Sequence, residues 1–178
     1  MVKIISQKTL FKNNYLNLVE NTIDFGNNII KTHADVYRKS AVSVFPITSS
    51  YEIYLIRQYR YLLDKEVLEA VAGIMDKDEN SLETARRELK EETGIVAGKI
   101  SELQSIFVAG SFVKIRQHLI LAQDLKFEDA TPEETEKIEL VKMSLDEAIN
   151  KVFTGEIMTG SSMLGVLLLD KMRERGEI

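Results

Sequence analysis

Residues 73–95 read GIMDKDENSLETARRELKEETGI, and the interpretation of the whole chain depends on this stretch. Its apolar residues recur at the spacing of one helical face: Leu82, Ala85 and Leu89. This spacing predicts a helix from Ser81 to Thr93. We expect Ser81 to cap the start of the helix and Gly94 to end it, because hydroxyl side chains favour the first position and glycine the last.

Three carboxylates lie in the C-terminal half of this predicted helix: Glu88, Glu91 and Glu92. Their spacing of three and four residues puts them on one side of the helix, where like charges repel. Glu88 and Glu92 fall beside the apolar stripe and lie in the last turns, where the helix dipole disfavours anions. A divalent cation would neutralise this arrangement. Taken alone, however, three glutamates on a helix fit a solvated acidic face better than a metal site.

The composition limits which cation could bind. The chain has no cysteine and only two histidines, His33 and His118, which lack the spacing of metal ligands. Zinc sites, cysteine nucleophiles and Ser-His-Asp triads are therefore improbable. Ligands that offer only oxygen point to Mg²⁺ or Mn²⁺.

The wider pattern favours the metal site. Residues 87–95 read RELKEETGI. Seven residues separate this segment from Glu79, and five residues separate Glu79 from Gly73. This pattern resembles the signature of the Nudix hydrolases at every specified position. The resemblance implies that Glu88, Glu91 and Glu92 are catalytic residues that hold the metal ions. It also implies that Arg87 orients these glutamates and that Glu79 braces the preceding loop. Gly73 and Gly94 are implied to permit the turns of the motif.

The flanking sequence resembles the ADP-ribose pyrophosphatase branch of that family. The similar segments are Arg57–Arg60 (RQYR) and Leu68–Gly73 (LEAVAG). In this branch the residue before the first glycine of the signature gives its backbone carbonyl to a metal ion, which here implies Ala72. The resemblance also implies that the substrate is bound by three arginines: Arg38, Arg57 and Arg60. A guanidinium group suits this role because its fork pairs with two phosphate oxygens.

One segment departs from the pattern of this branch. A loop after the signature normally supplies an acid, whereas residues 109–116 (AGSFVKIR) contain none. Either the general base is then Glu91 or a member of the cluster Glu133–Glu136, or the substrate differs, or the activity is weak. Lys114 and Arg116 in this loop are either exposed cations at a strand end or ligands for an extra negative charge on the substrate.

The fold expected from these patterns is α+β: an α/β/α sandwich of the Nudix type around a mixed β-sheet, with an N-terminal strand extension. We expect one domain over residues 1–178, in which residues 1–40 form a β-strand region that dimerises and residues 41–178 form the catalytic core. Alternating and β-branched residues predict strands, and helical spacing predicts two C-terminal helices. The expected strands are Tyr15–Asp24, Ile29–Arg38, Ala41–Ile47, Tyr51–Tyr59, Ile106–Val108, Gln117–Ala122 and Ile138–Met143, and the expected helices are Leu145–Phe153 and Ser162–Arg173.

Charge and hydropathy exclude other classes of protein. The 178 residues include 23 Lys and Arg against 28 Asp and Glu, a net charge of −5, which disfavours nucleic acids and anionic membranes as partners. The first six residues lack the apolar core of a signal peptide, and the longest apolar run, Met163–Leu169, is too short to cross a membrane. We therefore expect a cytoplasmic protein.

The function expected from the resemblance is Mg²⁺-dependent hydrolysis of the pyrophosphate bond of ADP-ribose or a related nucleoside diphosphate sugar. The products are AMP, or another nucleoside monophosphate, and a sugar phosphate. Two alternatives stay open. The first is a Nudix hydrolase of nucleoside triphosphates or dinucleotides. The second is a non-catalytic Nudix domain that senses nucleotides.

Overall fold

The computed structural model describes residues 1–132 and 137–178, which form two compact units. Met1–Ser40 and Ile106–Arg116 make up the first unit, and Ala41–Ser105 and Gln117–Ile178 make up the second. The boundary at residue 40 coincides with the limit that we expect for the N-terminal region. The inclusion of residues 106–116 in the first unit is not evident from the sequence.

The first unit is built on a four-stranded sheet in the order β1-β2-β3-β9. The strands are β1 (Lys3–Lys12), β2 (Leu16–Asp24), β3 (Ile30–Arg38) and β9 (Val113–Lys114). The predicted hairpin is confirmed as β2 and β3, whose turn contains Asn27 and Asn28 at positive φ. The short strand β9 pairs in parallel with β3, so that Lys114 lies opposite Tyr37.

The second unit contains two further sheets, in the orders β7-β4-β10-β8 and β11-β5-β6. β4 runs parallel to β10 and antiparallel to β7, which makes the first of these sheets mixed. The strands are β4 (Ala41–Pro46), β5 (Glu52–Arg60), β6 (Lys65–Glu69), β7 (Val71–Ile74), β8 (Ile95–Phe107), β10 (Arg116–Phe127) and β11 (Glu139–Ser144), and the helices are α1 (Ser81–Thr93), α2 (Leu145–Thr154) and α3 (Gly160–Glu174).

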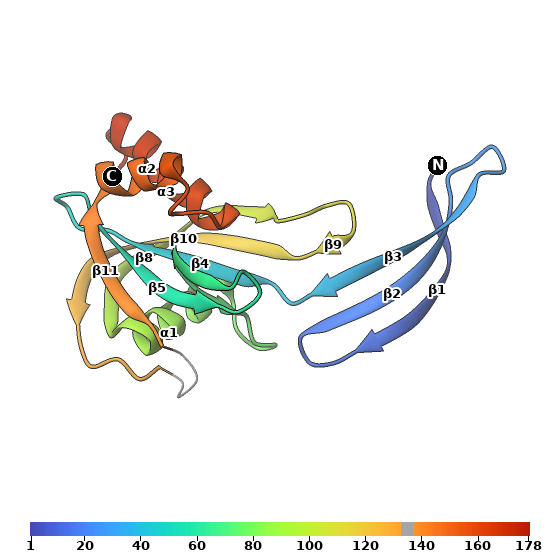
Figure 1. Ribbon diagram of the computed structural model, residues 1–178, viewed down its shortest axis with the longest axis horizontal. Helices are drawn as coiled ribbons and strands as arrows, with labels where there is room; N and C mark the ends of the chain where they lie inside the picture. The colour runs from blue at the N-terminus through green and yellow to red at the C-terminus, as the bar shows by residue number, and fades with distance from the viewer. Residues whose placement is uncertain (133–136) are drawn as a thin grey trace. The chain divides into compact units, whose positions relative to one another are not determined.

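Helices cover both faces of these strands. Figure 1 shows α1 on one side of β4 and β5 and helices α2 and α3 on the other. Val44 and Ile56 pack with Ala85 and Leu89 of α1, whereas the opposite face of the same strands packs against α2 and α3. Strands covered on both faces read as continuous apolar runs, as β4 does. The prediction of an α+β sandwich around a mixed sheet is confirmed.

The helix bounds agree closely with the expected ones, but the cap of α1 differs. Asn80, not Ser81, is the N-cap: its Oδ1 accepts from the backbone N–H groups of Leu82 and Glu83, both at 3.0 Å. Glu83 completes a capping box by accepting from the Asn80 backbone N–H at 2.9 Å. Gly94 ends the helix with φ at 70°, a left-handed conformation that favours glycine. No helix of the described residues is long and apolar enough to span a membrane.

Helix α3 approaches β4 so closely that one of its residues must be glycine. A Cβ on Gly165 would overlap the ring of Phe45, which is fully buried. We expect Gly165→Ala to lower the free energy of unfolding by about 1–3 kcal/mol, because overpacking forces the ring or the helix to move. Urea denaturation measures the change.

Gly160→Ala is the matched control for this substitution. Gly160 is in the same helix, and a Cβ there meets no atom within 4 Å. Alanine should therefore leave stability unchanged or raise it by up to about 1 kcal/mol through its higher helix propensity. Equal effects of the two substitutions would contradict the packing argument.

Candidate active site

The site predicted on α1 is built on a close contact between the helix and strand β7. Gly73 pairs with Val42 of β4, and a Cβ at Gly73 would overlap the carboxyl group of Glu88. The resemblance predicts that Gly73 permits a turn, but this residue lies within β7 and its φ is not positive. Gly73 instead provides the space into which the Glu88 side chain, only 14% exposed, is packed.

Arg87 connects the glutamates of the motif to one another. Its Nε and Nη2 donate to the two carboxylate oxygens of Glu79 at 2.8 and 3.0 Å, a bidentate pair. Its Nη1 donates to Glu88 at 2.9 Å and to Glu91 at 3.1 Å. One guanidinium group therefore contacts three carboxylates. The expected roles of Arg87 in orienting the glutamates and of Glu79 in bracing the loop are consistent with these bonds.

The same bonds shift the pKa values of both partners. The hydrogen bond from Arg87 is the main reason that the pKa of Glu79 is lowered to about 2, with a smaller contribution from the Thr84 hydroxyl. The hydrogen bond to Glu79 in turn raises the pKa of Arg87. Both groups are charged at neutral pH, and Glu79 stays charged well into the acid range.

Burial differs among the three predicted metal ligands. Glu92 is buried, with 7% of its surface exposed, and the side chain of Glu88 is 14% exposed, whereas the side chain of Glu91 is 45% exposed. Glu88 and Glu92 therefore lean toward the interior, as their positions beside the apolar stripe predict. Burial of two carboxylates one turn apart is costly unless positive charge is near.

The positions of the predicted ligands and the kind of donor atoms that they offer decide whether they fit a metal ion. Across residues 1–132 and 137–178, no three acidic or histidine side chains already converge closely enough to hold an ion. Two of the predicted ligands, Glu88 and Glu91, are instead bonded to Arg87. The donors are nonetheless all oxygen, and the contact with Gly73 holds Glu88 against the strand that contains Ala72, whose backbone carbonyl is a further predicted ligand. This set fits Mg²⁺ or Mn²⁺.

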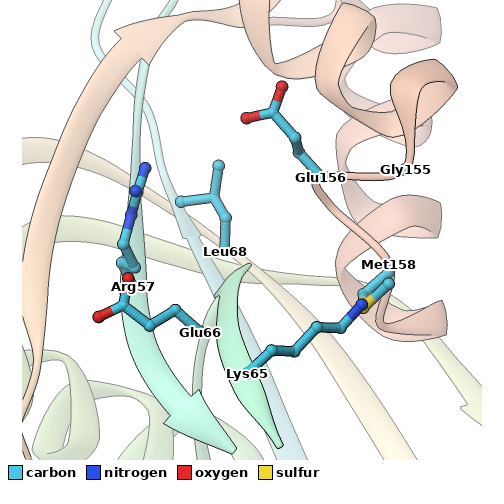
Figure 2. Close-up of a pocket in the computed structure, with 7 residues that line it drawn as sticks. All are labelled: Arg57, Lys65, Glu66, Leu68, Gly155, Glu156 and Met158. Carbon is cyan, nitrogen blue, oxygen red and sulfur yellow. The ribbon is translucent and has the colours of Figure 1, made fainter. Parts of the chain in front are cut away.

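The three predicted substrate arginines occupy different surroundings. Arg60 lies on the α1 side of β5, where its Nε donates at 2.6 Å to the buried carboxylate of Glu69. Arg57 lies three residues before Arg60 in β5. Because successive side chains of a strand point to opposite faces, Arg57 lies on the other face of β5. There it lines a pocket of about 280 Å³ with residues of β6 and of the α2–α3 loop (Figure 2). The structure therefore does not bring Arg57 and Arg60 together.

Arg38 belongs to the first unit. It lines a hollow of about 220 Å³ in which it is joined by Lys114 and Arg116, the two cations of the loop that lacks the expected acid. The sequence indicates Arg38 on the one hand and the pair Lys114 and Arg116 on the other, without a sign that they lie together. Their proximity follows from the pairing of β3 with β9, a two-residue strand with too short a pattern to be recognised in the sequence. Residues 133–136, which contain an alternative general base, lie outside the described residues.

Comparison with known proteins agrees with the motif. The NUDIX domain family matches residues 37–158. ADP-ribose pyrophosphatase of Bacillus subtilis is 26% identical over 169 residues, covering 94% of this chain and 91% of the relative. A methanol dehydrogenase activator of Bacillus methanolicus is 30% identical with the same coverage. Among solved structures, an ADP compounds hydrolase superposes with a TM-score of 0.88 at 23% identity, covering 99% of this chain and 97% of that one, which supports the fold.

The Arg87–Glu79 pair gives a stability prediction that depends on pH. At neutral pH, Glu79→Gln should lower the free energy of unfolding by about 1–3 kcal/mol, the range for hydrogen bonds to charged groups. Because the pKa of Glu79 is lowered in the folded state to about 2 from 4.5, the stabilisation is fully present above about pH 5. It is lost as the pH falls from 4.5 toward 2.

Urea denaturation of the wild type and Glu79→Gln at a series of pH values measures this. The two stabilities should converge at the acid end of the series. Glu128→Gln, which removes an exposed ion pair with Lys90 at 3.0 Å, is the control and should change stability by less than about 1 kcal/mol at every pH. A difference for Glu79→Gln that is constant down to about pH 2 would show that the carboxylate is not held by Arg87.

Proposed function

Because this chain belongs to the NUDIX domain family and is a Nudix pyrophosphohydrolase, we propose that it hydrolyses ADP-ribose or a related nucleoside diphosphate sugar to a nucleoside monophosphate and a sugar phosphate. The observation that carries the proposal is the Glu88 carboxylate, which packs against Gly73 and is bonded to Arg87. The relative from B. subtilis, named an ADP-ribose pyrophosphatase, supports the choice of substrate.

The proposal includes a bound Mg²⁺ or Mn²⁺ ion. Glu88, Glu91 and Glu92 would hold it, together with the backbone carbonyl of Ala72. When bound, such an ion polarises phosphoryl oxygens and lowers the pKa of the attacking water. Arg87 has a defined part in this arrangement, because it keeps Glu88 and Glu91 oriented and partly neutralised before an ion binds.

The remaining proposed roles concern the substrate and the proton. Arg60 and Arg38 would bind the phosphate groups, with a guanidinium fork suited to paired oxygens. Arg57 lies in the separate pocket of Figure 2 and would bind a more distant part of the substrate. Glu91 is the most exposed of the three predicted metal ligands on α1, which suits a group that accepts a proton from water. Glu133–Glu136 provides the alternative base.

The experiment that tests the function is a panel of nucleoside diphosphate sugars, dinucleotides and nucleoside triphosphates, each assayed with Mg²⁺ for phosphate-containing products. We expect the highest kcat/KM for a nucleoside diphosphate sugar. Glu92→Gln should lower kcat by at least about a hundredfold, comparable to the loss of one preorganised electrostatic stabiliser. Its stability without metal should be unchanged or higher, because a buried like charge is removed.

Glu128→Gln, also a neutralised glutamate but exposed and outside the motif, is the control and should keep normal turnover. Preference for triphosphates or dinucleotides would contradict the substrate class. Binding without turnover of any compound would indicate a nucleotide sensor. The panel has to be broad, because a relative of 30% identity is named as an activator of a dehydrogenase.

We also propose that the protein is a cytoplasmic homodimer that associates through its first strand. All ten residues of β1 are exposed, and they include the apolar side chains of Ile4, Leu10 and Phe11. β1 is also at the edge of its sheet, where backbone groups are available for pairing. The absence of cysteine is compatible with a reducing compartment.

Light scattering at micromolar concentration tests the dimer. The wild type should have about twice the 20.3 kDa mass of one chain, and Phe11→Asp should shift it toward the monomer because a charge would be buried in the contact. Phe153→Asp is the control, since Phe153 is an exposed phenylalanine of α2 in the other unit. A monomeric wild type would overturn the proposal.

A further inference from the structure

Two adjacent serines in the first turn of α3 are bonded to the backbone just before Ala72 and to the strand beside it. Ser162 Oγ accepts a hydrogen bond of 2.9 Å from the backbone N–H of Ala70. Ser161 Oγ accepts one of 3.1 Å from the hydroxyl of Ser43, which lies opposite Ala72 in the β4–β7 pair. All of these residues belong to the second unit.

Ala70 is the residue at which the chain passes from one sheet to the other. Glu69 ends β6 in the β11-β5-β6 sheet, and Val71 begins β7 in the β7-β4-β10-β8 sheet. Ala70 lies between the two strands and is buried, so its N–H group needs a partner other than a strand. Ser162, which is also buried, provides that partner. The serine therefore fixes the backbone two residues before Ala72.

Strand β7 needs such a fixed point because it is short and lies at the edge of its sheet. It has four residues, and in the part of the chain that the structure describes it has a partner strand, β4, on one side only. Backbone groups on the outer side of an edge strand are available to other partners, as a metal-binding carbonyl requires. The same feature leaves the strand less constrained, so its position depends on the other groups that hold it.

The short serine side chains reach the strands because α3 lies very close to β4. Gly165 is three and four residues after the two serines and therefore lies on the same face of the helix. The overlap that a Cβ on Gly165 would have with Phe45 shows how near the helix is to β4. Because α3 lies on the side of β4 opposite α1 (Figure 1), the serines hold the sheet from the side that the glutamates of α1 do not occupy.

Neighbouring side chains complete a hydroxyl network around the two serines. Thr159 is the N-cap residue of α3, but its hydroxyl makes no capping bond and instead donates to Ser162 Oγ at 2.7 Å. A threonine at this position ordinarily caps the helix. The Gln117 amide donates to Ser43 Oγ at 2.9 Å. Each of the two bonds to the strands is thus supported by a further donor, which makes the network more rigid than either bond alone.

We propose that Ser161 and Ser162 are positioning residues for the metal site, which hold the backbone of Ala72 where its carbonyl binds the ion. Neither serine touches the ion in this arrangement, because they act through Ser43 and the Ala70 backbone. The inference rests on the proposed function, since it concerns the same metal ion. Removal of a group that orients a metal ligand from outside typically lowers metal affinity about ten- to a hundredfold.

Binding of Mn²⁺ in the absence of substrate tests the inference, with the electron paramagnetic resonance signal of the free ion as the readout. Ser162→Ala should weaken Mn²⁺ binding about tenfold, because the Ala70 N–H loses its partner and β7 can shift. Ser161→Ala is the milder change, because Ser43 stays bonded to Gln117, and should weaken Mn²⁺ binding about threefold. If Ser162→Ala does not fold, wild-type affinity in Ser161→Ala overturns the inference.

Ser144→Ala is the matched control. Ser144 Oγ also accepts from a backbone N–H, that of Glu147 at 3.1 Å, at the start of α2 in the same unit. The loss of this bond should lower the urea midpoint, as Ser162→Ala does, but leave Mn²⁺ affinity unchanged. A purely structural role of the two serines predicts lower stability with wild-type Mn²⁺ affinity in every variant, and that result would overturn the inference.

Failure of this inference and failure of the proposed reaction give different results. If Ser162→Ala weakens Mn²⁺ binding but the wild type hydrolyses no nucleoside diphosphate sugar, the proposed reaction fails while the positioning role stands. If the wild type hydrolyses these compounds and both serine variants bind Mn²⁺ as tightly as the wild type does, the positioning role alone is overturned. A wild type that binds no Mn²⁺ would overturn the metal site and the positioning role together.

Discussion

The repulsion among the carboxylates of α1 is the constraint on which the site depends. Glu88, Glu91 and Glu92 lie within two turns of one helix, and two of them are largely buried. Arg87 relieves part of this repulsion by bonding to Glu88 and Glu91 while the fork of its guanidinium group is anchored on Glu79. The helix can therefore fold with its acids in place before any ion binds. The electrostatic repulsion that remains among these carboxylates would favour the binding of a cation.

The packing of the sandwich determines where that helix can lie. β4 and β5 are buried on both faces, so helices are required on each side of them. On one side, Gly165 brings α3 against Phe45, and on the other, Gly73 brings α1 against β7. Both glycines allow a helix to pack closely against a strand, and neither is needed for a turn. The same sheet that positions the acids thereby separates the surroundings of Arg57 from those of Arg60, although only two residues lie between them in the sequence.

Much of this was predictable from the sequence where the local pattern is strong. The bounds of α1 and the inward lean of Glu88 and Glu92 follow from helical spacing, and the doubly buried strands follow from their apolar runs. The prediction of Ser81 as the cap was wrong, because Asn80 offers a capping box with Glu83 that a hydroxyl-based choice overlooks. β6, β7 and β9 are too short to show a period. The hollow that joins Arg38 to Lys114 depends on the pairing of Tyr37 with Lys114, 77 residues apart, which no local pattern encodes.

The distribution of charge within the chain decides where phosphate groups can bind. A chain with a net charge of −5 is a poor attractor of polyanions as a whole, so phosphate groups must be bound by local positive charge. Arg60 cannot supply this alone, because its Nε is already bonded to the buried carboxylate of Glu69. Among the described residues, no acidic side chain lines the hollow that contains Arg38, whereas Glu69 contacts Arg60. Local charge, and not the charge of the whole chain, therefore decides where an anion can bind.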